Sequence, residues 1–314
     1  MFGFSLGLGV ATVAIPLLAL AAGYDPAAIG FLAATSAASQ FTMRLALPML
    51  LGRFPDRTLI GVSSLLLLAA FAILALTSAL PAFLVAQVLQ GSARAIFWTS
   101  SQTHAIRGQG RAVRRLIDLN VAGNLGTLTG PALGGMLAVV GLPVALVAAV
   151  GGALFAAIGA LALDELPTFD RRRSAGTVDL LRRDGVDIAC WASVVGGTWW
   201  SMMGSFVPVI LVGAGIGPQG IGWLVTASEA AGMVALIALR DVPSARVRSI
   251  VTVAAFVAGA CLAGIALGPP VLAGYALLLL AGVALIVGLG AYQRLSVAAE
   301  KEVAITPEVE NDPK

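Results

Sequence analysis

Residues 58–78 read TLIGVSSLLLLAAFAILALTS, a stretch that contains no charged residue. As an α-helix, this stretch is long enough to cross a hydrocarbon core of about 30 Å. The loop before it carries Arg53 and Arg57, whereas the loop after it, near Ala79, carries no Lys or Arg. Spans of this kind are oriented with the cationic end in the cytoplasm. The stretch therefore predicts a transmembrane helix that starts on the cytoplasmic side.

The same arrangement repeats along the chain. All but two of the nineteen Lys and Arg residues lie in alternate gaps between long apolar stretches or in the carboxyl-terminal tail. The pattern predicts a multi-pass protein with both termini in the cytoplasm. Arginine far outnumbers lysine, which favours a GC-rich bacterial genome and hence the bacterial inner membrane. Hydropathy predicts about ten spans, at residues 4–22, 27–50, 58–78, 81–103, 117–139, 142–163, 187–212, 218–239, 249–267 and 271–293.

Composition excludes several classes of protein. The chain is 59% hydrophobic and 11% charged, whereas soluble domains carry roughly 25% charged residues. The net charge of +3 lies in loops beside membrane spans, so it does not indicate nucleic-acid binding. His104 is the only histidine, and the spans contain neither a nucleophile–histidine pair nor a phosphate-binding loop. We therefore expect no enzyme activity, no metal and no cofactor.

A long polar loop divides the predicted spans into two groups. We expect a six-helix bundle over residues 1–163, a cytoplasmic linker over 164–186, a four-helix partial bundle over 187–293 and a disordered tail over 294–314. Two helical bundles joined by a long inner loop are typical of transporters built from repeated halves. The expected fold is thus all-α and integral to the membrane, with two pseudo-repeated bundles of six and four helices.

The fifth span carries the most specific pattern. Glycines recur every four residues on one helix face, a spacing that favours close helix packing, and a proline interrupts the backbone ladder. Asn120, Asn124 and Thr127 follow on the adjacent face. By itself the pattern is equally typical of plain helix packing. The residues that define it are Gly126, Gly130, Pro131, Gly134 and Gly135.

This span resembles the antiporter motif G-x-x-x-G-P-x-x-G-G of the drug:proton antiporter branch of the major facilitator superfamily. A second, partial resemblance lies before the third span, where Gly52, Asp56 and Arg57 match the family's loop motif. The resemblance implies a helix that packs against span eight and restrains leak, and a gating loop. The family has twelve spans, so the chain resembles a major-facilitator fold that lacks the last two. Asp56 should then lack the partner that the eleventh helix provides.

The fourth span carries a polar face that lipid could not satisfy. Its members are Gln87, Gln90, Gly91, Arg94, Trp98 and Ser101. The family's motif here is R-x-x-Q-G, which Gln90 and Gly91 match, while Gln87 replaces the arginine. We interpret Arg94 as a cavity cation for an anionic substrate or a coupled carboxylate. The alternative is a structural arginine that extends toward the cytoplasm, an interpretation that we favour for Arg44 in span two.

Two further candidates lie in the second half. Glu229 is the only acid at mid-bilayer depth, where a carboxyl deprived of water binds a proton readily. It is either a proton carrier or a member of a fixed ion pair. Span seven presents Thr198, Ser201 and Met202 on one face, which is either a substrate-cavity wall or ordinary helix packing.

We therefore expect a secondary active transporter of small molecules that works by proton-coupled efflux and alternating access. Its partners are a small-molecule substrate and the lipid bilayer, with no nucleic acid. One alternative is a truncated, non-transporting relic or a subunit that assembles as an oligomer or with a partner supplying the missing helices. Another is a ten-span drug/metabolite exporter of a different fold.

Overall fold

The computed structural model describes residues 1–107, 112–168, 200–238 and 244–267, together with Gly197 and isolated positions up to Ala284. It divides into two compact units. The first comprises Met1–Arg172 and Ser201–Ala227, and the second comprises Arg173–Trp200 and Ser228–Lys314. Every regular element in the described ranges is an α-helix, which confirms the all-α class.

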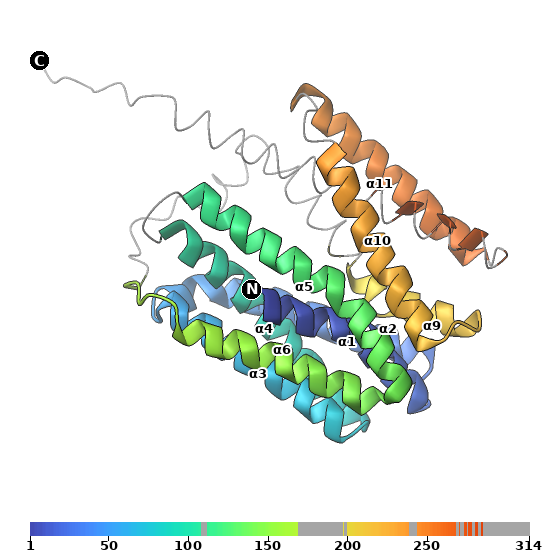
Figure 1. Ribbon diagram of the computed structural model, residues 1–314, viewed down its shortest axis with the longest axis horizontal. Coiled ribbons are helices and arrows are strands. Elements are labelled where there is room, and N and C mark those ends of the chain that lie inside the picture. Colours follow the sequence, from blue (N-terminus) through green and yellow to red (C-terminus); the bar gives the residue numbers. More distant parts are fainter. Residues whose placement is uncertain are drawn as a thin grey trace, which may run out of the picture. The chain divides into compact units, whose positions relative to one another are not determined.

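The first unit is a helical bundle in which α1 is central (Figure 1). Helix α1 packs on α5 and α6, helix α3 packs on α4 and α6, and helix α2 packs on α4. A shorter helix from the second half of the sequence, α9, packs on α1 and α2. The helices of this unit are α1 (Phe2–Ala21), α2 (Pro26–Leu51), α3 (Asp56–Leu76), α4 (Leu80–Arg107), α5 (Ala112–Val140), α6 (Leu142–Leu161) and α9 (Phe206–Gly213).

The six amino-terminal helices begin and end within a few residues of the spans predicted for them. They form because a chain in hydrocarbon must satisfy each backbone N–H and C=O internally, and uninterrupted apolar runs do so as helices. Four described helices, α1, α3, α4 and α6, are long and apolar enough to cross a membrane. Helices α4 and α5 extend beyond the predicted spans by about one turn at their charged ends.

The loops that lack Lys and Arg lie at one end of the bundle, and those that carry arginines lie at the other. At the end that lacks Lys and Arg, Gly23 adopts φ +84°, and the Asp25 side chain accepts a hydrogen bond from the Ala28 amide to start α2. The Tyr24 hydroxyl donates to the Ser78 carbonyl at 2.9 Å and its ring meets Phe83 edge-on. The α1–α2 and α3–α4 turns, which both lack Lys and Arg, are therefore in direct contact.

Among the helices described in the second half, α9 is short and α10 is divided between the two units. Residues 201–203 are helical, but a turn at Gly204 and Ser205 separates them from α9, so the described part of predicted span seven is not one continuous helix. The Ser205 hydroxyl donates to the Ser201 carbonyl at 2.6 Å, a local bond that competes with the helix ladder. Helix α10 (Pro218–Ala238) starts in the first unit and ends in the second, which also holds α11 (Ser244–Ala266).

The predicted linker and tail lie largely outside the described residues, as does most of the tenth span. The division into six and four spans therefore stays a prediction.

Candidate functional site

The polar face of α4 divides into two parts in the structure. Gln87 and Ser101 are buried, whereas Gln90, Arg94 and Trp98 are half-buried and follow one another at four-residue spacing. Residues four apart lie above one another on a helix, so these three form one partly accessible stripe. This stripe is the candidate lining of a substrate site.

Gly91, the other half of the Gln-Gly pair, serves helix packing. A Cβ at this position would collide with the Ser36 carbonyl and approach the Gln40 amide to 3.0 Å, both on the α2 backbone. Beside it, the Ser39 hydroxyl donates to the Val88 carbonyl at 2.7 Å, and the Ser39 and Ser92 hydroxyls lie 2.9 Å apart. The sequence similarity at Gly91 thus reflects the close approach of α2 and α4.

Arg94 has no acidic partner among the described residues. Its Nε atom is buried without a hydrogen-bond partner, and no ion pair involves it in the described ranges. Arg44 on the neighbouring helix α2 lies close enough for the two positive charges to repel each other. Because a partnerless cation in a membrane helix is costly, the arrangement is unlike that of a structural ion pair.

Glu229 lies in α10 with only 8% of its surface exposed, and its Oε1 atom has no hydrogen-bond partner among the described residues. The preceding residue, Ser228, is also buried and its hydroxyl is likewise without a partner in the described ranges. The acid is therefore in the low-dielectric environment that its position in the sequence predicted.

The glycines of the α5 motif contact two different helices. A Cβ on Gly130 would lie 2.6 Å from the Gly9 Cα atom, and a Cβ on Gly134 would lie 2.7 Å from the Val10 carbonyl oxygen. Gly126 faces Phe2, Ser5 and Leu6 in the same way, so these three glycines fit α1. Gly135 instead faces Gly222 of α10. Span five thus contacts span eight through Gly135, as the family resemblance implied, while the glycine stripe itself packs on α1.

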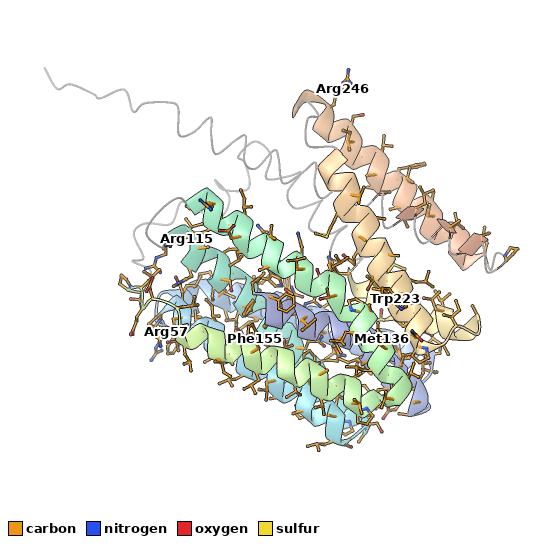
Figure 2. The ribbon with its side chains drawn as sticks, in the orientation of Figure 1. Arg57, Arg115, Met136, Phe155, Trp223 and Arg246 are labelled. Atoms are coloured by element: carbon orange, nitrogen blue, oxygen red, sulfur yellow. The ribbon has the colours of Figure 1, made fainter. Side chains whose placement is uncertain are left out.

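Asp56 and Arg57 lie in a cluster at the charged end of the bundle, which Arg57 and Arg115 mark in Figure 2. Asp56 is only 1% exposed and its Oδ2 atom accepts from Arg107 Nη1 at 3.0 Å. Arg107 also donates to the Pro167 carbonyl, and Arg57 donates to the Leu161 carbonyl at 2.8 Å. Antiparallel packing of α3 and α4 brings Arg107 beside Asp56, so this carboxylate has a partner from the fourth span. That it lacks the partner expected from an eleventh helix stays a prediction.

Breaking this ion pair should destabilise the first unit. We expect Arg107→Ala to lower its stability by roughly 3 kcal/mol, because it leaves the buried Asp56 carboxylate unpaired. Asp56→Ala should lower it less, because Arg107 is partly exposed and keeps its bond to the Pro167 carbonyl. The exchanged pair, Asp56→Arg with Arg107→Asp, should recover part of that loss. Thermal unfolding in detergent measures all three. An exchanged pair less stable than both single variants would contradict the pairing.

The remaining candidates are more dispersed. Ser201 is exposed and Met202 half-buried near the turn before α9, and Thr198 lies outside the described residues. Asn120 and Asn124 are exposed on α5, and Gly52 ends α2 in a right-handed helical conformation that other residues adopt readily. Within the described ranges, none of these residues makes a hydrogen bond or an ion pair with the α4 stripe.

Sequence reasoning misses two residues that the structure connects to the motifs. The sequence marks Arg107 only as a topology-determining cation, although its place at the end of span four puts it beside the loop that contains Asp56. Thr226 precedes Glu229 by three residues and matches no motif, yet its hydroxyl contacts the α5 backbone on both sides of Pro131. Neither contact has a signal in local sequence, because each joins segments far apart in the chain.

A bundle of membrane-length helices with buried polar groups on α4 and α10 is typical of a polytopic membrane protein. A sequence model of the Major Facilitator Superfamily matches residues 1–299. The chain therefore belongs to the major facilitator superfamily, and it is a secondary transporter rather than an enzyme.

Solved structures of this family share the fold at low sequence identity. The nucleoside transporter NupG is 14% identical with a TM-score of 0.71, and the match covers 96% of this chain and 81% of NupG. A D-xylose–proton symporter is 11% identical, with a TM-score of 0.67 and coverage of 95% and 84%. The human organic anion transporter MFSD10 is 18% identical, with a TM-score of 0.61 and coverage of 94% and 83%. No curated protein sequence matches the chain.

Proposed function

We propose that this transporter exports small amphipathic molecules in exchange for protons across the bacterial inner membrane. The observation that carries the proposal is Glu229, a buried carboxyl whose Oε1 atom has no partner among the described residues. Such a group exchanges a proton with less structural cost than a carboxylate held in an ion pair. The match of α5 to the antiporter motif favours export over import.

Arg94, Gln90 and Trp98 are the proposed substrate contacts on α4, with Gln87 behind them and Ser201 and Met202 as further contacts. An arginine without a carboxylate partner is suited to an anionic group, and the Trp98 ring to an apolar or aromatic one. We infer that preferred cargo combines a negative charge with an apolar body. The charge pattern of the loops supports an orientation with both termini in the cytoplasm.

Removing the proton-binding group should separate transport from its energy source. We expect wild-type protein in proteoliposomes to accumulate fluorescein, an amphipathic anion, when a pH gradient is imposed. Glu229→Gln should abolish accumulation, because the amide cannot carry a proton, while passive exchange of the probe continues. Time courses of fluorescein uptake with and without the gradient measure both quantities.

Ser228→Ala is the matched control, because Ser228 is the adjacent buried polar residue and its hydroxyl has no partner in the described ranges. It should retain gradient-driven accumulation. Full coupling in Glu229→Gln, or wild-type flux that ignores the gradient, would remove the proposed proton role.

A further inference from the structure

Helices α5 and α10 cross at two glycines. A Cβ on Gly135 would lie 2.9 Å from the Gly222 Cα atom, and a Cβ on Gly222 would lie 3.0 Å from the Gly135 Cα atom. Real Cβ atoms essentially never lie under 3.0 Å from a neighbouring atom, so the 2.9 Å approach at Gly135 shows that the two main chains touch directly. The next residues, Met136 and Trp223, are about half exposed and mark the crossing in Figure 2.

Four residues before Gly135, Pro131 interrupts the hydrogen-bond ladder of α5. Proline has no N–H to give to the carbonyl four residues back, and its ring pushes the helix open at this level. The bond that would normally follow joins the Ala132 N–H to the Leu128 carbonyl. In this protein the Thr226 hydroxyl lies between those two groups, accepting from the Ala132 N–H at 3.0 Å and donating to the Leu128 carbonyl at 3.1 Å.

We propose that Thr226 is a positioning residue that bridges the Ala132 N–H and the Leu128 carbonyl beside Pro131, and thereby couples this part of the α5 hydrogen-bond ladder to contact between α5 and α10. Its single hydroxyl accepts from one of these backbone groups and donates to the other, a role that side chains and waters play where a proline interrupts a helix. The proposal depends on the transporter class of the chain and not on proton coupling.

The coupling follows from what happens when the two helices part. Separation of α10 from α5 removes both hydrogen bonds, leaving the Ala132 N–H and the Leu128 carbonyl unsatisfied until α5 straightens or water enters. Since Leu128 belongs to the first half of the sequence and Thr226 to the second, this bridge forms only when these two segments touch. The hydroxyl therefore favours the state in which α5 and α10 are in contact over the state in which they are apart.

The rate of hydrogen exchange at the Ala132 amide measures directly whether its hydrogen bond to Thr226 is formed. Thr226→Val removes the hydroxyl at nearly constant shape, and it should raise deuterium uptake of the α5 segment from Leu128 to Ala138 in nanodiscs by about three- to tenfold, the range expected for one or two hydrogen bonds between membrane helices. Thr226→Ser keeps the hydroxyl and should stay within about twofold of wild type on the same scale. Equal uptake in the Val and Ser variants would overturn the proposal.

Repeating the Thr226 substitution in a Pro131→Ala variant distinguishes two roles of Thr226, hydrogen bonding to the α5 backbone and ordinary side-chain packing. With an N–H restored at 131, the helix can straighten and Ala132 can bond to Leu128 directly, so Thr226→Val should then have no effect on uptake. The same increase in both backgrounds would mean that Thr226 acts only by filling space. If Thr226→Val alone fails to assemble, Pro131→Ala should restore its assembly, and failure to do so also overturns the proposal.

A second measurement follows the conformational consequence. Ile221 on α10 is fully buried, so a thiol introduced by Ile221→Cys, after replacement of Cys190 and Cys261 by Ser, should react with maleimide only when α10 moves. Thr226→Val should speed labelling by about three- to tenfold and Thr226→Ser should not, since the lost bonds held the helices together. A labelling rate of Thr226→Val equal to that of wild type would show that the Thr226 hydrogen bonds do not hold α5 and α10 together.

Discussion

Replacing Gly130 by Val is expected to prevent the amino-terminal helices from assembling. A Cβ there would lie 2.6 Å from the Gly9 Cα atom and 2.8 Å from the Leu6 carbonyl oxygen, both of which belong to the α1 backbone. Backbone atoms cannot rotate away, so α1 and α5 must separate along their length. Overpacking in a dense core costs about 1–3 kcal/mol when side chains can adjust, and a backbone clash exceeds that range.

The matched control is Gly151→Val on α6. Gly151 is exposed and a Cβ added to it would meet nothing within 4 Å, so the same change adds apolar surface that lipid accepts. Size-exclusion chromatography and thermal unfolding in mild detergent compare the two variants. We expect a monodisperse, wild-type-like profile for Gly151→Val and aggregated protein for Gly130→Val. Equal behaviour would mean that α1 and α5 do not pack through this stripe.

The helices of this fold could be predicted from the sequence because each one depends on a local property. A run such as 58–78 must be helical once it enters hydrocarbon, whatever its neighbours are. The spacing of Gly126, Gly130 and Gly134 likewise predicted that another backbone approaches, because only glycine permits it. Which backbone approaches is not a local property, and α1 rather than α10 meets this stripe.

The site was less predictable for the same reason. Asp56 and Arg107 are both visible in the sequence, but their pairing follows from the antiparallel packing of α3 on α4. The match of Gly91 to a family motif suggested chemistry, whereas its place against the α2 backbone explains it by sterics. The break at Gly204 and Ser205 was hidden because hydropathy stays high through a turn inside an apolar run. The assignments of Glu229 and Arg94 to transport remain predictions.

Replacing Arg94 by Met should strongly reduce transport of an anionic cargo while leaving the fold as stable as wild type or more so. A hydrogen bond to a charged group contributes about 1.5–3 kcal/mol, so losing the guanidinium should weaken apparent affinity for fluorescein by roughly 10- to 150-fold. The fold should not suffer, because an unpaired arginine within a membrane span costs at least about 2.5 kcal/mol on insertion scales. Removing the charge also relieves its repulsion from Arg44.

Arg107→Met provides the opposite case with the same change of side chain. Arg107 pairs with Asp56, which is 1% exposed, so its loss leaves a buried carboxylate uncompensated and should lower the unfolding temperature. Thermal unfolding of the two variants, together with fluorescein uptake by Arg94→Met, tests the argument. If Arg94→Met is destabilised as strongly as Arg107→Met, Arg94 is a structural cation with a partner outside the described residues. If Arg94→Met is as stable as wild type but no longer takes up fluorescein, Arg94 serves substrate binding, and the protein keeps this charge in the membrane interior because the substrate requires it.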